Sequence, residues 1–288
     1  MKTLVLGSNG QLGQALADTV PDDADFVSLD IPDLDITNAS AVSTVCRELQ
    51  PDVIINAAAY TAVDLAETET ELAAAVNVIG PRNIAAASRD VDARLIHIST
   101  DFVFDGQASR PYDVDAPTNP LSVYGRTKRD GELAILEGVS ANAAVLRTAW
   151  LYSKTGKNFV KTMLALMGSR DEISVVADQR GTPTWANSLA VAVWSLARKS
   201  DLGGIFHWTD AGETTWHEFA VAIQEEALEL GLLVKAIPIH PISTDAYPTA
   251  AVRPSYSVLN TESTCSALDL QPTPWRINLS RMLKGMNV

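Results

Sequence analysis

Short apolar runs alternate with longer stretches of helical periodicity through the first half of the chain. In the stretch 39–49, Val42, Val45 and Leu49 fall on one side of a helix, whereas the run 52–56 is apolar through its centre and fits a strand buried on both faces. Alternation of this kind predicts a parallel sheet with helices on both faces. The predicted strands lie at 3–6, 26–29, 53–55, 95–98 and 144–146, and the predicted helices at 11–19, 39–49, 69–88 and 123–137.

The pattern loosens after about residue 151, where proline and glycine become more frequent. Helical stretches persist there at 158–167, 187–197 and 216–230. We therefore predict an α/β fold: a doubly wound parallel sheet over 1–150, then a smaller C-terminal α/β part over 151–288 whose later segments can return to the first part. The cleft between the two parts is the expected ligand site.

A glycine-rich loop, Gly7-Ser8-Asn9-Gly10-Gln11-Leu12-Gly13, joins the first predicted strand to the first predicted helix. Glycine lets backbone amides approach a phosphate without a Cβ in the way, and the positive end of a helix attracts the same group. Three glycines near a turn also occur by chance, but their place between a strand and a helix favours a dinucleotide site. We expect residues 1–150 to form a Rossmann-type NAD(P)-binding domain that contacts its cofactor through Gly7, Gly10, Gln11, Leu12 and Gly13.

Asp30 ends the second predicted strand, close to where a carboxylate would hold the adenosine ribose hydroxyls. Such a carboxylate repels a 2′-phosphate, and no lysine or arginine occurs in residues 8–38 to offset it, so the local charge favours NADH. A turn or helix-cap aspartate is the alternative for Asp30. Asp35 and Ile36 lie where an adenine contact would fall, with the carboxylate on the amino group and Ile36 over the ring.

The segment Asn56-Ala57-Ala58-Ala59 follows the third predicted strand. Small residues here let the chain run close beside a dinucleotide, although alanines also suit a crowded strand end. We include Ala58, Ala59, Tyr60 and Thr61 among the expected cofactor contacts.

Tyr124 and Lys128 are spaced i, i+4 on a predicted helix, so they share one face. Hydride reduction of a ketone leaves an alkoxide that needs a proton, and a lysine beside a tyrosine stabilises the phenolate and can bond the nicotinamide ribose. Thr100, at the end of a predicted strand, can hydrogen-bond the substrate oxygen. The pair alone also fits an exposed helix face, but its order after the glycine loop and the alanine turn favours a catalytic site in which Tyr124 and Lys128 also contact the cofactor.

The composition excludes some classes of partner. The net charge of −13 over 288 residues disfavours nucleic acid and anionic lipid. No apolar run is long enough to span a bilayer, and the N-terminal run is too short for a signal peptide, so we expect a cytoplasmic protein. Cys46 and Cys265 lie far apart in no metal-like spacing, which favours free thiols.

The segment His97-Ile98-Ser99-Thr100-Asp101-Phe102-Val103-Phe104-Asp105-Gly106 closely resembles a motif of the dTDP-4-dehydrorhamnose reductases, which are extended short-chain dehydrogenases. The resemblance implies NAD(P)H-dependent reduction of the 4-keto group of dTDP-4-dehydro-6-deoxy-L-mannose to dTDP-L-rhamnose. It makes Tyr124 the proton donor and Lys128 its partner, and it brings Thr100 and Asp101 to the sugar. The similarity continues in register through 56–64, 120–128, 146–152, 158–163, 178–184 and 253–259.

Two further residues are substrate candidates by this resemblance, each with a structural alternative. Trp150 would form an apolar wall against the hexose, unless it is a core aromatic at a strand end. Arg253 is the best local cation for the substrate pyrophosphate, unless it forms a structural salt bridge.

The chain departs from the family in one respect, and a second point stays open. Some members dimerise through magnesium held by glutamates, whereas this chain has Ala15, Asn187 and the segment 282–285 (Met-Leu-Lys-Gly) at the corresponding positions. We therefore expect no bound metal, and a monomer or weak homodimer rather than a magnesium-bridged one. The family commonly takes NADPH although the local charge favours NADH, so both cofactors stay open.

Two other functions are alternatives. A related nucleotide-4-ketosugar reductase would share the same motifs, because pocket shape decides the sugar. A non-catalytic dinucleotide-binding regulatory subunit would be free to lose Tyr124 or Lys128, and both are present.

Overall fold

A six-stranded parallel sheet forms the centre of the computed structural model, which describes residues 1–139 and 142–286. Residues 140–141 and 287–288 of the two predicted parts lie outside the described residues. The strand order is β10-β5-β4-β3-β1-β2, so the chain winds outward in both directions from β1 and β3, as the predicted doubly wound fold requires. The strands are β1 (Lys2–Leu6), β2 (Asp25–Leu29), β3 (Val53–Asn56), β4 (Arg94–Thr100), β5 (Ala143–Thr148) and β10 (Gly204–His207).

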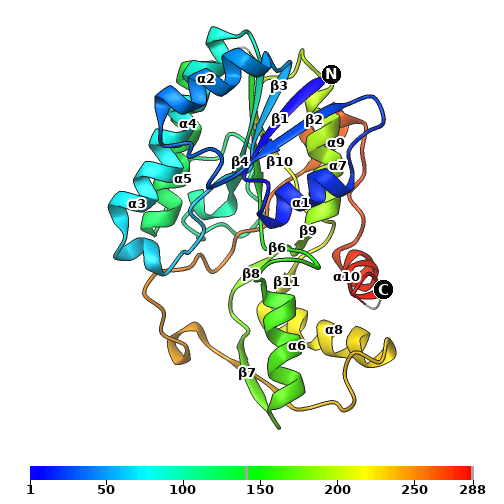
Figure 1. Cartoon of the computed structure of the whole chain (residues 1–288). Coiled ribbons are helices and arrows are strands. Elements are labelled where there is room, and N and C mark those ends of the chain that lie inside the picture. The colour runs from blue at the N-terminus through cyan, green and yellow to red at the C-terminus, as the bar shows by residue number, and fades with distance from the viewer. Residues whose placement is uncertain (140–141, 287–288) are drawn as a thin grey trace.

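Helices cover both faces of this sheet (Figure 1). One layer holds α2 (Ala39–Leu49), α4 (Gly80–Asp90) and α5 (Val123–Gly138); the other holds α1 (Gln11–Asp18), α7 (Ala186–Ala197) and α9 (Glu262–Leu268). Two apolar cores result, one on each face, which explains why the central strands are apolar throughout. Among the described residues, no helix is both long and apolar enough to cross a membrane.

The helix predicted over 69–88 is interrupted by a π-helical turn. It consists of α3 (Thr70–Ala74), the π turn Ala75–Ile79 and α4. The turn places the amide of Asn77 against the loop after β3, where it bonds the backbone of Tyr60 on both sides and also donates to Thr127 Oγ1 at 3.1 Å. π turns recur at functional sites, and this one ties the loop after β3 to α5.

A smaller α/β part lies below the carboxyl ends of the central strands (Figure 1). It has its own apolar core around Phe219 and Leu279, and the chain returns from it to the first core through α7, β10 and α9. Its helices are α6 (Phe159–Ser169), α8 (Trp216–Glu229) and α10 (Trp275–Lys284). Its short strands pair as β6 (Leu151–Tyr152) with β9 (Thr184–Trp185), β7 (Ile173–Val176) with β12 (Ile239–Ile242), and β8 (Arg180–Gly181) with β11 (Thr214–Thr215).

Candidate active site

A hollow of about 170 Å³ lies where β1, β2 and β3 end, which is where an open α/β sheet binds its ligand. A larger open hollow, of about 590 Å³ near Arg110 and Glu213, contains none of the predicted site residues. The smaller hollow is lined by seven of the predicted cofactor residues: Gly7, Gly10, Asp30, Asp35, Ile36, Ala58 and Ala59.

The glycine loop is packed so tightly that side chains would not fit. A Cβ on Gly7, whose φ is +86°, would lie 2.5 Å from the backbone nitrogen of Ala58, and a Cβ on Gly13 would lie 2.2 Å from the carbonyl oxygen of Gly7. Gly10 caps α1 without any side-chain hydrogen bond, so the amides of the first turn point toward the loop without a capping partner. Leu12 is buried in the core, so a contact of this residue with a cofactor stays a prediction for its backbone. The loop therefore fits a pyrophosphate group.

The acidic residues of the hollow are held by short local contacts. Asp30 Oδ2 accepts from the backbone nitrogen of Asn9 at 2.8 Å, and Oδ1 accepts from the nitrogen of Ile31 at 2.8 Å. Asp35 Oδ1 accepts from both the nitrogen and the hydroxyl of Thr37. The Asp30 carboxylate thus fixes the glycine loop while it lines the hollow, so the two interpretations of this residue are compatible.

Gln11, Tyr60 and Thr61 are among the predicted cofactor residues that do not line the hollow. The side chain of Gln11 connects the two parts of the molecule, because its Oε1 accepts from Ser153 Oγ at 3.1 Å and from Asn158 Nδ2 at 2.9 Å. The Tyr60 hydroxyl donates to Glu69 at 2.6 Å, and Thr61 is exposed. Contacts of these residues with a cofactor stay predictions.

The first turn of α5 fixes the position of Tyr124. Ser122 caps the helix by accepting from the nitrogen of Gly125, and a Cβ on Gly125 would lie 2.2 Å from the carbonyl oxygen of Phe102. This close approach brings the Tyr124 ring edge-on to Phe102, with centroids 5.6 Å apart. Tyr124 is consequently 9% exposed, at the end of β4 where Thr100 lies.

Lys128 is buried one turn further along α5. Its Nζ donates to the carbonyl oxygen of Ile98 at 2.7 Å, which positions the ammonium below Thr100 on β4. Burial lowers the pKa of Lys128 to about 8, and the carboxylate of Glu132 opposes that change. At neutral pH the lysine is therefore mostly an ammonium that can bond a ribose and stabilise a phenolate.

The Tyr124 phenol stays protonated over the physiological range. Burial raises its pKa to about 12, the Thr100 hydroxyl lowers it and the Asp101 carboxyl raises it. An alkoxide is more basic than such a phenolate, so the phenol can donate its proton to an alkoxide. It does not lose that proton to water at neutral pH. These properties suit a general acid.

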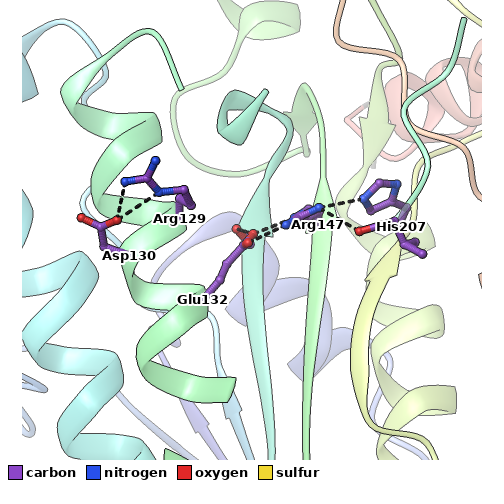
Figure 2. Close-up of polar contacts among 7 residues, drawn as sticks. Arg129, Asp130, Glu132, Arg147 and His207 are labelled. Atoms are coloured by element: carbon purple, nitrogen blue, oxygen red, sulfur yellow. Dashed lines mark hydrogen bonds and ion pairs between the residues drawn. The ribbon is translucent and has the colours of Figure 1, made fainter. Parts of the chain in front are cut away.

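A buried ion pair that the sequence did not predict joins α5 to β5 (Figure 2). Arg147 on β5 bonds both oxygens of Glu132, at 2.8 and 2.7 Å, and Glu132 also accepts from Ser99 Oγ at 2.5 Å. Arg147 further contacts His207 Nε2 at 3.4 Å, and burial together with the Arg147 charge lowers the pKa of His207 to about 3. The sequence does contain one indication of Glu132: it follows Lys128 by four residues and therefore shares its helix face.

Trp150 stacks on Trp216 rather than standing alone at the strand end. The ring centroids are 3.5 Å apart with an interplanar angle of 7°, and a Cβ on Gly181 would lie 2.5 Å from the Trp150 ring. Trp150 has a φ of +46°, which is rare for a bulky residue and is held here by this packing. Contact with a hexose stays a prediction for the part of the ring that remains accessible.

Arg253 forms a two-pronged ion pair with Asp64. Its two terminal nitrogens bond the two carboxylate oxygens at 3.0 and 2.7 Å, and the nitrogen of Ala251 adds a third contact to Asp64. The pair lowers the pKa of Asp64 and ties the loop after β3 to the segment 247–260. This observation supports the structural alternative for Arg253, although a pyrophosphate contact stays a prediction because the side chain is partly exposed.

Known proteins match this chain over almost its whole length. The model of the family described as "RmlD substrate binding domain" matches residues 1–288. A dTDP-4-dehydrorhamnose reductase of Aggregatibacter actinomycetemcomitans is 40% identical over 282 residues, which cover 96% of each chain. A probable dTDP-4,6-dihydroxy-2-methyloxan-3-one 4-ketoreductase of Streptomyces antibioticus is 43% identical over 263 residues, covering 90% of this chain and 86% of that one.

A solved structure agrees with these relatives. The crystal structure of a dTDP-4-dehydrorhamnose reductase from Bacillus anthracis in complex with NADP is 39% identical, and the match covers 99% of each chain with a TM-score of 0.92. The resemblance found in the sequence is thus confirmed. The chain belongs to the RmlD family, that of the dTDP-4-dehydrorhamnose reductases.

Proposed function

We propose that this protein reduces the 4-keto group of dTDP-4-dehydro-6-deoxy-L-mannose with NADH or NADPH and so forms dTDP-L-rhamnose. The observation that carries the proposal is the position of Tyr124, Lys128 and Thr100, which meet at the end of β4, in the same sheet whose other strands end at the glycine-lined hollow. Family membership supplies the sugar class.

In this mechanism the bound nicotinamide supplies the hydride. The residues Gly7 to Gly13 would hold its pyrophosphate, and Asp30 would hold the adenosine ribose. Tyr124 donates its proton to the carbonyl oxygen, Thr100 orients that oxygen, and the Lys128 ammonium stabilises the phenolate that remains. Trp150, Asp101 and Arg253 are the proposed contacts to the hexose and its pyrophosphate.

The test is an assay of NADH and NADPH oxidation with the dTDP-ketosugar, followed by determination of the configuration of the product. Formation of dTDP-L-rhamnose supports the proposal, whereas a product of the other configuration identifies a related ketosugar reductase. The Streptomyces relative favours that second candidate. Cofactor oxidation without any partner protein would exclude a regulatory subunit.

We also propose that the two parts of the chain bind different ligands. Residues 1–150 would bind the cofactor, and most of 151–288 would bind the nucleotide sugar, with α7, β10 and α9 belonging structurally to the first part. The protein would act in the cytoplasm.

Replacing Asp30 by asparagine is expected to change cofactor preference. The substitution removes the charge near the 2′ position but keeps an oxygen that can accept from Asn9. We expect the ratio of kcat/KM for NADPH to that for NADH to rise about tenfold, or about 1.4 kcal/mol. The exposed neighbour Asp33, which does not line the hollow, provides the matched control Asp33→Asn. An unchanged ratio in Asp30→Asn would show that the carboxylate does not face the 2′ position.

We propose further that the protein is a monomer or a weak homodimer rather than a magnesium-bridged dimer. Ala15 lies on α1 and is buried against the core, and Asn187 is a neutral residue in the first turn of α7. The mass in solution, measured by light scattering, should therefore be the same in magnesium and in EDTA. A dimer that dissociates in EDTA would contradict this expectation.

A further inference from the structure

The Thr100 hydroxyl carries one proton but lies within reach of Asp101, the backbone nitrogen of Phe102 and the Tyr124 phenol. Its oxygen lies 3.0 Å from Asp101 Oδ1, accepts from the nitrogen of Phe102 at 3.2 Å and also faces the Tyr124 phenol, where it lowers the pKa of that phenol. A hydroxyl donates one hydrogen bond and accepts two. The protonation state of Asp101 therefore decides where the proton of Thr100 points.

An ionised Asp101 would work against catalysis. A carboxylate only accepts, so it would take the proton of Thr100. Thr100 could then only accept from Tyr124, and the phenol proton would point at Thr100 instead of at the substrate ketone.

A neutral Asp101 reverses this arrangement. Its O–H donates to Thr100 Oγ1, and the two lone pairs of that oxygen are then occupied by Asp101 and the nitrogen of Phe102. The Thr100 proton is left for the Tyr124 oxygen or the ketone oxygen. The phenol proton is consequently free for the substrate.

The surroundings of Asp101 extend the range of its neutral form up to about pH 6. The residue is 2% exposed, and burial is the largest influence on the pKa of its carboxyl group. The groups that face it are the hydroxyl of Thr100 from β4, the phenol of Tyr124 from α5, the hydroxyl of Ser257 from the segment 254–258 and the backbone amides of Asp101 and Phe102. Among the described residues, no cation contributes to its ionisation. A buried carboxylate without a neighbouring cation is costly, whereas a buried carboxylic acid can serve as a hydrogen-bond donor.

We propose that Asp101 acts as a neutral acid that donates a hydrogen bond to Thr100 and thereby directs the Tyr124 proton to the substrate. Asp101 is then a positioning residue. The inference rests on the proposed ketone reduction. It gives Asp101 a role besides its proposed contact with the hexose, and in that role the side chain is a neutral acid rather than a carboxylate.

Two substitutions separate these roles. Asp101→Leu removes the donor and is expected to lower kcat about 100-fold. Asp101→Asn keeps a donor of the same shape and is expected to recover about tenfold of that loss, with most of the effect in kcat rather than KM. A carboxylate that binds the sugar would instead give similar losses in both variants, mainly as a raised KM.

The pH profile provides a second criterion. Burial raises the pKa of Asp101 to about 6, and the neutral form is the active one, so kcat/KM of the parent should fall as the pH rises through about that value. Asparagine does not titrate, so kcat/KM of Asp101→Asn should not fall in this pH range. The same fall of kcat/KM in Asp101→Asn would overturn the proposal.

Infrared spectroscopy of the free protein tests Asp101 independently of activity. The parent should show a carboxylic acid signal that titrates near pH 6 and is missing from Asp101→Asn; if that variant does not fold, Thr100→Val should shift the same signal. Absence of an acid signal above the range of ordinary aspartates would contradict the inference. If the protein does not reduce the dTDP-ketosugar, the infrared result still stands for Asp101, so the two proposals fail separately.

Discussion

Substitution of Tyr124 by phenylalanine should lower kcat for ketosugar reduction by about 100-fold to 10,000-fold, the usual contribution of a positioned general acid. The phenol is buried against Phe102 and loses only its oxygen in this variant, so the ring packing and the helix start should persist. Because the lost interaction acts on the alkoxide, KM for the sugar and the Kd for the cofactor should change little. Single-turnover measurement of cofactor oxidation, with separate binding titrations, checks both parts of the expectation.

The control is a second tyrosine outside the site. Tyr247 is 59% exposed, so Tyr247→Phe removes the same atom without touching the end of β4. It should leave kcat within the error of the parent. A Tyr124→Phe variant that kept more than about a tenth of the parent kcat would mean that water or another group delivers the proton.

Many of the helices and strands around Tyr124 could be predicted because local hydrophobic periodicity determines them. The helix expected over 39–49 has those bounds in the structure, and the predicted strands agree with β1 to β5 to within a few residues. The placement of Tyr124 and Lys128 on one face of α5 followed from their spacing of four residues, and their catalytic role stays a prediction.

Features that depend on distant or very short segments could not be predicted. β10 begins at Gly204, in the region where the hydrophobic pattern loosens, and its place beside β5 is set by tertiary pairing. The π turn at Ala75–Ile79 leaves no mark in hydrophobic spacing. The Asp64–Arg253 pair and the Trp150–Trp216 stack join segments whose proximity only the folded chain creates.

Loss of Glu132 is expected to destabilise the protein more than any surface change. Arg147 and Glu132 are each 2% exposed, and the pair links α5 to β5 (Figure 2). Removing one member of a buried ion pair leaves an uncompensated charge and typically costs about 3–5 kcal/mol. We therefore expect Glu132→Leu and Arg147→Met each to lower the free energy of unfolding by about that amount, measured by denaturant titration.

The same helix supplies a matched surface control. Arg129 and Asp130 form an ion pair at 2.8 Å with side chains 33% and 45% exposed (Figure 2). An exposed pair contributes about 0–1 kcal/mol, so Asp130→Asn should change the free energy of unfolding by no more than that. Equal effects in Asp130→Asn and Glu132→Leu would show that burial does not set the difference.

The double variant Glu132→Leu/Arg147→Met tests where the loss in free energy of unfolding comes from. It arises either from losing the pair itself or from leaving one buried charge without its partner. Apolar residues of similar volume can replace a buried pair with little loss, so the double variant should be more stable than either single variant. Additive losses would contradict a coupled pair. Stability recovered in this way should not restore the environment of Lys128, because the Glu132 carboxylate raises the lysine pKa. The double variant should therefore fold well yet hold Lys128 with a pKa lower than in the parent, and reduction should weaken at a lower pH as the ammonium is lost.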